Sequence, residues 1–157
     1  MANAEATGRT GTPYEVAIER GKILEFAAAT HSANPAYWQD PNPVIPPTFL
    51  TVQMFWAEWA EQLGTGGDPN PWHHVELDQQ RGMHAEQEYI FHGPPPRAGT
   101  KLTAQSRIGE IYDKQGRKGG TMTFAVMITE FRDETGRLVA EARLTGVETG
   151  RVPEETS

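Results

Sequence analysis

Apolar and polar positions recur with two different periods, and the change of period divides the chain into two parts. Near the start, residues 14–18 alternate as in a short strand, and apolar side chains in residues 20–31 then recur at the i, i+3, i+4, i+7 spacing of an amphipathic helix. We expect this helix to end before Asn34-Pro35, because proline disfavours helical geometry in the preceding residue. Residues 34–47 contain five prolines and are predicted to be a loop without a regular element.

A second helix is predicted over residues 48–63, with Thr48 as its N-cap and Gly64 after its end. Its apolar side chains occupy most of the circumference: Phe49, Leu50, Val52, Met54, Phe55, Trp56, Ala57, Trp59 and Leu63. A helix that is apolar nearly all round is expected in the middle of a domain. The aromatic stripe on this helix is interpreted as core or subunit interface.

From residue 75 onward the period is two, which is typical of strands. Four strands are predicted, over residues 84–93, 101–113, 120–133 and 136–150. Because their connections are short, we expect the four to form an antiparallel meander. The sequence therefore predicts a single α+β domain, in which an antiparallel sheet packs against one hydrophobic helix.

Composition narrows the classes of function. The 157 residues carry a net charge of −7 without a long basic run, which argues against nucleic-acid binding. Absence of cysteine excludes disulfides, thiol nucleophiles and cysteine-bound metals. No apolar stretch is long enough to span a membrane, and the first residues do not resemble a signal peptide, so we expect a cytoplasmic protein without membrane insertion. The domain is assigned to residues 13–150, with flexible ends at 1–12 and 151–157.

Several separated segments resemble the MaoC-like (R)-hydratases and dehydratases of acyl thioesters. They are residues 26–38 (FAAATHSANPAYW), 45–52 (IPPTFLTV), 84–102 (HAEQEYIFHGPPPRAGTKL) and 137–150 (RLVAEARLTGVETG). The resemblance implies a single hot-dog fold, in which an antiparallel sheet wraps around a central hydrophobic helix. It also implies a substrate carried as a coenzyme A or acyl-carrier-protein thioester, with no other cofactor.

In active members of this family, the loop after the first helix has a sequence that resembles G-D-x-N-P-x-H. The Asp and the His of this motif form the catalytic pair. Aligned on Asn34-Pro35, this chain has His31 in place of the glycine, Ser32 in place of the aspartate and Tyr37 in place of the histidine. Serine has no useful acidity near neutral pH, and tyrosine, with an ordinary pKa of about 10, is a poor base. No catalytic residue is therefore assigned. For His31 there are two interpretations: a weak candidate for a substitute base, or a surface residue at the end of a helix, and the second is preferred.

Five residues are predicted to contact the substrate: Asn34, Tyr37, Trp38, Thr48 and Phe49. The first three would line the acyl tunnel, although helix capping and aromatic packing explain them equally well. The last two would present backbone N–H groups to the thioester carbonyl, and helix capping is the favoured alternative.

No metal site is predicted. The side chains considered were His73, His74, His84, His92, Glu86 and Glu88, and their spacing matches no known metal motif. Alternating polar residues on a strand are more typical of a solvated face.

Taken with the resemblance, the missing pair predicts a non-catalytic or weakly catalytic subunit of an (R)-specific 2-enoyl-thioester hydratase or 3-hydroxyacyl-thioester dehydratase. Its partner would be a MaoC-like hot-dog subunit that carries the Asp/His pair, as in heterodimeric (3R)-hydroxyacyl dehydratases. One alternative is a homodimer that binds acyl thioesters without chemistry. A thioesterase is a further alternative, which no acidic site pattern in the chain favours.

Overall fold

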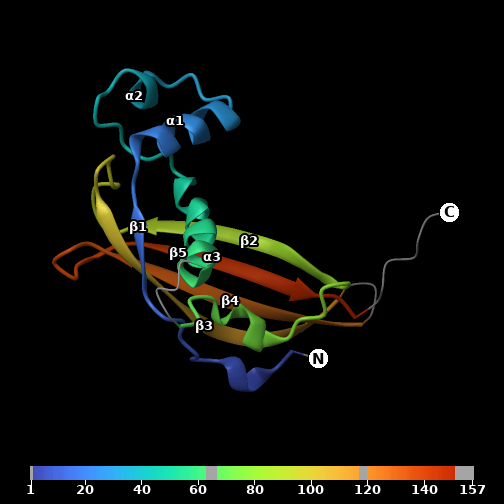
Figure 1. The fold of residues 1–157 in the computed structure, drawn as a ribbon. Helices are drawn as coiled ribbons and strands as arrows, with labels where there is room; N and C mark the ends of the chain where they lie inside the picture. Colours follow the sequence, from blue (N-terminus) through green and yellow to red (C-terminus); the bar gives the residue numbers. More distant parts are fainter. Residues whose placement is uncertain (1, 63–66, 117–119, 151–157) are drawn as a thin grey trace.

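The computed structural model describes residues 2–62, 67–116 and 120–150, so Gly64 and the end at 151–157 lie outside the described residues. One antiparallel sheet carries all five strands, with helices against one face (Figure 1). The strands are β1 (Tyr14–Ala17), β2 (Gly82–Phe91), β3 (Lys101–Gln115), β4 (Thr121–Arg132) and β5 (Leu138–Glu148). The helices are α1 (Arg20–Ala29), α2 (Pro35–Trp38) and α3 (Gln53–Gln62), with 3₁₀ helices η1 (Ala4–Ala6), η2 (Phe49–Val52) and η3 (Pro71–Val75).

The strand order is β1-β3-β4-β5-β2, which confirms a meander for β3, β4 and β5 but not for β2. The prediction of a four-strand meander was wrong because β2 pairs with β5 at the far edge of the sheet. Three prolines follow β2 in residues 92–100, and this segment bonds to the loop before η2 instead of making a tight turn. Ile45 N donates to Pro96 O at 3.0 Å, and Ala98 N donates to Pro43 O at 2.9 Å.

The two faces of the sheet differ in composition. Strand pairing places Ser106 with Thr129 and Met127 with Leu144 on the face that packs against the helices, which we call the helix face. Charged side chains gather on the opposite face, called the back face, where Arg143 lies across from Glu88. The alternation expected for strands is therefore present, with one apolar and one charged side.

The main core lies between the helix face and the segment from β1 to α3. Its largest fully buried side chains include Phe49, Leu50, Ile23, Leu102 and Phe131. A second cluster, between the sheet and the helices η1 and η3, contains Ala6, Val75, Ile108, Ala125 and Met127. Both clusters lie on the helix face, so this side of the sheet supplies the burial that stabilises the domain.

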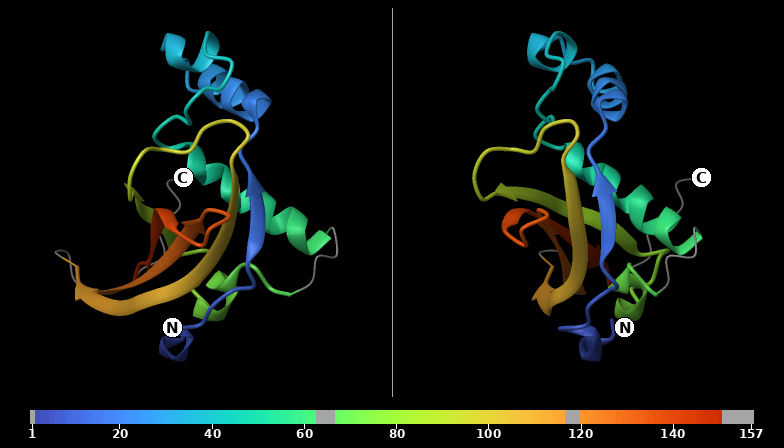
Figure 2. Two further views of the ribbon diagram at one scale, coloured as in Figure 1. Left: turned by 90° about the vertical axis from the view of Figure 1, so that its left-hand side faces the viewer. Right: turned by 60° about the vertical axis from the view of Figure 1, so that its left-hand side comes forward.

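Helix α3 lies across the sheet, but only one of its sides is covered (Figures 1 and 2). Ala57 is buried, whereas the exposed fractions are 52% for Met54, 49% for Phe55 and 40% for Trp59. The expectation of a fully buried helix was therefore wrong for this chain alone. A single sheet covers one side of a helix, and none of the described segments covers the other.

The segment from α1 to η2 lies beyond one end of the sheet (Figure 2). The prediction that residues 34–47 contain no regular element was wrong, because they contain the one-turn helix α2. The Asn34 side chain accepts a hydrogen bond from Ala36 N, and Pro35 occupies the first turn, where its missing N–H costs nothing. Thr48 precedes η2, as expected of a cap position, but its side chain makes no capping hydrogen bond.

Residues 2–12 are packed against the domain, contrary to the expectation of a flexible N-terminus. Ala6 is fully buried in η1, and Asn3 N donates to Val75 O at 2.8 Å. Gly8 N donates to Ile108 O at 2.9 Å, which continues the sheet edge beyond β1. Small residues allow this segment to lie flat on the edge of β3, so its lack of periodicity gave no sign of order.

Candidate functional site

Ser32 and Tyr37, which the sequence resemblance aligns with the catalytic pair, are both tied into the local fold. Ser32 N donates to Ala27 O at 2.9 Å, and its hydroxyl accepts from Asn34 N at 3.4 Å. The Tyr37 side chain is only 8% exposed and belongs to the main core. Neither position therefore presents a carboxylate or an imidazole to a ligand.

His31 lies at the end of α1, where the chain leaves the helix. Its backbone has a positive φ of 52°, its N–H donates to Ala28 O at 3.0 Å, and its side chain is exposed. His31 is therefore a surface residue at the end of a helix, which was the alternative to its interpretation as a substitute base. Any role in proton transfer would require a ligand or a partner chain to cover it.

Asn34 and Trp38 stabilise the same turn. Asn34 caps α2, and Trp38 Nε1 donates to Ser32 O at 2.8 Å while 42% of the Trp38 side chain stays exposed. Asn34 therefore acts as a helix cap and Trp38 anchors the turn, as in the structural alternative to substrate binding. The exposed part of the Trp38 ring is the surface that this turn offers to another molecule.

Thr48 and Phe49 begin η2, but they differ in exposure. The Phe49 side chain is 1% exposed and packs edge-to-face on Phe26, with ring centroids 5.5 Å apart. Thr48 is exposed. Phe49 is therefore a packing residue, and only the backbone at the start of η2 is available to a ligand.

An open pocket of about 800 Å³ lies between α3, η3 and the helix face of the sheet. Its lining is mostly apolar: from α3 come Met54, Phe55 and Ala57, and from the sheet Met83, Met127, Leu144 and Gly146. We call it the α3 pocket. None of the five residues predicted to contact substrate lines it. Asn34, Tyr37 and Trp38 belong to α2 and its cap, and Thr48 and Phe49 lie at the start of η2.

Two polar residues that line the α3 pocket, Gln53 and Ser106, are bonded to buried polar groups behind them. The Tyr14 hydroxyl donates to the Gln53 side-chain oxygen, and the Ser106 and Thr129 hydroxyls lie 2.8 Å apart. Burial raises the pKa of Tyr14, and a hydrogen bond with Ser106 partly offsets this effect. These groups are neutral at ordinary pH and suit hydrogen bonding, whereas the acidic and basic side chains that line the pocket are Glu58, Glu76, His73 and His84.

Sequence reasoning missed the pocket residues. Ser106 and Thr129 interrupt the apolar face of two predicted strands, and a search for polar residues at inward positions would have found them. The apolar wall gives no such signal, because packing and ligand-binding residues have the same composition.

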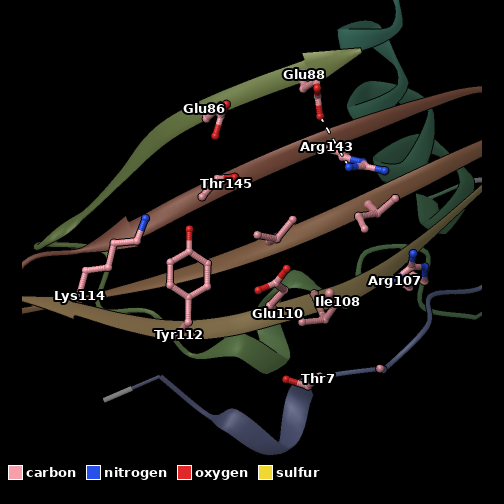
Figure 3. Close-up of a pocket in the computed structure, with 14 residues that line it drawn as sticks. Thr7, Glu86, Glu88, Arg107, Ile108, Glu110, Tyr112, Lys114, Arg143 and Thr145 are labelled. Atoms are coloured by element: carbon pink, nitrogen blue, oxygen red, sulfur yellow. Dashed lines mark ion pairs between the residues drawn. The ribbon is translucent and has the colours of Figure 1, made fainter. Parts of the chain in front are cut away.

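A second pocket, of about 950 Å³, lies on the back face (Figure 3). Its charged side chains come from neighbouring strands, and the Arg143 guanidinium lies 3.8 Å from the Glu88 carboxylate. Arg143 also lies 3.6 Å from Glu141, while its Nε is buried without a hydrogen-bond partner among the described residues. Lys114 lies 5.1 Å from the centre of the Tyr112 ring. This surface carries both charges in about equal measure and resembles a solvated strand face.

Within the described part of the chain, none of the helices combines the length and the apolar character needed to cross a membrane.

Comparison with known proteins gives one family. Residues 5–142 match the family described as FAS1-like, dehydratase domain region. The chain is also 38% identical over 112 residues to the UPF0336 protein SCO4636 of Streptomyces coelicolor, and the match spans 66% of this chain and 67% of that protein.

Solved structures agree on the fold. The HadBC (3R-hydroxyacyl-ACP dehydratase) complex of Mycobacterium tuberculosis has a chain that is 22% identical with a TM-score of 0.67, covering 90% of this chain and 96% of that one. The ChsH1-ChsH2 complex of the same organism gives 16% identity and a TM-score of 0.65, covering 94% and 91%. At these identities the likeness concerns the fold, which is the expected single hot dog. By its family match, the chain belongs to the FAS1-like dehydratase domain region family.

Proposed function

We propose that this chain is the subunit without a proton-transfer pair in a two-subunit, (R)-specific 2-enoyl-thioester hydratase or 3-hydroxyacyl-thioester dehydratase. The observation that carries the proposal is the pair of side chains at the two catalytic positions. Ser32 is bonded to its own turn, and Tyr37 is buried in the core. The chain would supply binding surface, and the partner subunit would supply the acid and base.

The chemistry explains why these substitutions matter. In hydration, the water oxygen forms a bond to C3, one water proton goes to a base, and a proton is delivered to C2 as the double bond is lost. Both proton transfers need a group that changes charge near neutral pH, beside donors that stabilise the developing enolate oxygen. A serine hydroxyl and a buried tyrosine do not meet this need. His31 has suitable chemistry, but it is exposed at the end of α1.

An exposed apolar surface supports the requirement for a partner. We call Met54, Phe55 and Trp59 of α3, together with Met83 of β2, the apolar stripe, and each of these side chains is at least 40% exposed. Large exposed apolar side chains that adjoin one another are typical of interfaces. Two of the similar solved structures, HadBC and ChsH1-ChsH2, are complexes, which favours a second hot-dog chain as the partner.

The edge of the sheet gives a second reason to expect a partner. Strand β2 is ten residues long and forms one edge, where it pairs only with β5 among the described strands. Long edge strands tend to pair with another chain unless they are covered. A partner strand on β2 would extend the sheet and would bring the second chain next to Met83.

The α3 pocket supports an acyl chain as the bound part of the substrate. Methionine, leucine and phenylalanine side chains form the apolar part of its lining, beside the acidic Glu58 and Glu76 and the histidines His73 and His84. A hydrocarbon chain gains binding energy from apolar side chains. On the charged back face it would remove water from charged groups without offering them hydrogen bonds in return. In this assignment the thioester end points toward the partner, where the chemistry takes place.

Turnover of the chain alone and with a partner tests the proposal. The full chain is purified alone and, separately, co-expressed with a MaoC-like chain of the same genome that has the intact G-D-x-N-P-x-H motif. Hydration of a 2-enoyl-CoA is followed by loss of the enoyl absorbance. We expect little activity from the chain alone, and activity from the pair that exceeds that of the partner by itself.

Three results would contradict the proposal. Strong hydration by the isolated chain that His31→Ala abolishes would identify His31 as a substitute base. Thioester binding without turnover, whichever partner is supplied, would favour the homodimeric binding protein instead. Release of free coenzyme A by the isolated chain would indicate a thioesterase.

A further inference from the structure

Three side chains with potential metal ligands, Asp68 before η3 and His73 and His74 within it, lie close together, and His73 also lines the α3 pocket. His73 Nε2 lies 3.3 Å from Asp68 Oδ2, and His74 Nε2 lies 3.4 Å from the same oxygen. One ligand atom from each of the three residues lies within 4.8 Å of the others. Four residues separate Asp68 from His73, so the short segment folds back to bring them together.

The distances favour a shared ion over a pair of simple salt bridges. A charge-assisted hydrogen bond between nitrogen and a carboxylate oxygen is typically about 2.7 to 2.9 Å long. Zinc bonds of about 2.0 to 2.2 Å at tetrahedral angles place neighbouring ligand atoms about 3.3 to 3.5 Å apart. Both observed distances fall in the second range, and the three ligand atoms lie within 4.8 Å of one another.

The backbone around the three residues is held by long-range contacts. Asp68 N donates to the Thr12 hydroxyl at 3.0 Å, and Thr12 N donates to Asp68 O at 2.8 Å. On the other side, the Asn3 side chain donates to His74 O at 3.2 Å. Asn70 caps η3 by accepting from Trp72 N at 3.2 Å. A site whose ligands are fixed in this way loses less entropy when an ion binds.

The side chains are accessible enough for an ion to enter. The exposed side-chain fractions are 51% for Asp68, 58% for His73 and 34% for His74. The imidazole rings of the two histidines lie with their centroids 4.0 Å apart, and both rings lie beside the same carboxylate. A divalent cation would bind both rings in their neutral form there.

We propose that Asp68, His73 and His74 bind a divalent cation of the zinc class. Two imidazole nitrogens and one carboxylate oxygen suit zinc and its neighbours in the transition series, and three protein ligands leave one position for water. His73 also lines the α3 pocket, so the ion would join η3 to the segment at Asp68 at the pocket wall. This inference does not depend on the proposed function, and it revises the expectation that His73 and His74 bind no metal.

Calorimetry on the metal-free full chain tests the site. Zinc chloride is titrated into the protein in a buffer that does not chelate, and Co²⁺ absorption in the visible range is recorded as a second readout. We expect one ion per chain and a tetrahedral Co²⁺ spectrum. Asp68→Asn and His74→Gln should each weaken binding by more than about tenfold, since even partners outside the coordination shell commonly cost that much.

His84→Gln is the matched control, because His84 lines the same pocket but lies on β2 outside the cluster. We expect it to bind zinc as the unaltered protein does. Affinity should fall as the pH is lowered from about 7.5 to about 5.5, because protons compete for imidazole nitrogens. Circular dichroism of each metal-free variant shows whether the fold is retained.

Three results would overturn the proposal. The first is absence of stoichiometric zinc binding to the unaltered protein, which needs no variant to fold. The second is an Asp68→Asn protein that keeps the zinc affinity and the Co²⁺ spectrum of the parent. The third is an equal loss of affinity in the His84→Gln control.

Discussion

Replacement of Phe55 by alanine tests whether the apolar stripe is the surface that binds the partner. The Phe55 side chain is 49% exposed, and its ring lies at the middle of the stripe, 6.4 Å from the Trp59 ring. A phenylalanine has roughly 200 Å² of surface to bury, so about 100 Å² remains to be covered by another chain. At about 25 cal/mol per Å² this is worth about 2.5 kcal/mol, or about 60-fold in the dissociation constant.

The assay is isothermal titration of the chain with its catalytic hot-dog partner, supported by light scattering of the mixture. We expect Phe55→Ala to weaken association by about 60-fold. Tyr112→Ala serves as a control of the same kind, because Tyr112 is a partly exposed aromatic residue on the back face, stacked on Phe124. It should leave the association unchanged. Urea unfolding of each chain alone separates any loss of monomer stability from loss of binding.

The interface assignment is refuted if Phe55→Ala binds the partner as tightly as the parent while Tyr112→Ala does not. That result would place the partner on the back face, where the ion pair between Glu88 and Arg143 lies. Equal weakening by both variants would indicate a general loss of the native state, which the unfolding curves would then show.

Three further predictions concern the fold around the pocket. Phe49→Ala should lower the free energy of unfolding by about 3 to 5 kcal/mol in urea, because the ring is buried; a loss below about 1 kcal/mol would contradict the packing role. Gly146→Ala should cost about 1 to 3 kcal/mol, since an added Cβ would lie 2.6 Å from the Trp72 ring; unchanged stability would mean that the ring moves aside. Folding raises the pKa of Tyr14, so stability is complete below pH about 10 and falls above it. Tyr14→Phe should reduce this alkaline loss in pH-dependent unfolding, and an unaltered pH profile would exclude Tyr14 as its source.

Local patterns predicted most of the elements because each depends on neighbouring residues. The periods of the apolar residues located β1, α1, α3 and the four later strands close to their observed bounds. The pairing of β2 with β5 is a different matter, since it depends on contacts between residues about fifty positions apart, such as Tyr89 and Ala142. Helix α2 was missed because prolines were taken only as helix breakers, although proline is well suited to a first turn.

The candidate site was harder to predict from the sequence. Alignment on Asn34-Pro35 located the turn with Ser32 and Tyr37, and the resemblance gave the family. The α3 pocket, however, is assembled from α3, η3 and four separate strands, and no local pattern joins these segments. Asp68 was overlooked for the same reason, because its closeness to His73 follows from a fold in the connector rather than from a motif spacing.

The distribution of apolar residues around α3 links the fold to the proposed function. Its apolar positions are too many for the one sheet that this chain provides, and the excess side chains are those left exposed. Selection for a stable single chain would favour polar residues there, because exposed aromatic side chains promote aggregation without adding stability. The excess is explained if the helix has two surfaces to satisfy, one inside the chain and one against a second chain. The same helix borders the α3 pocket, so a partner bound to its exposed side would also close the pocket, and a chain with no proton-transfer pair would then contribute to catalysis by enclosing the substrate.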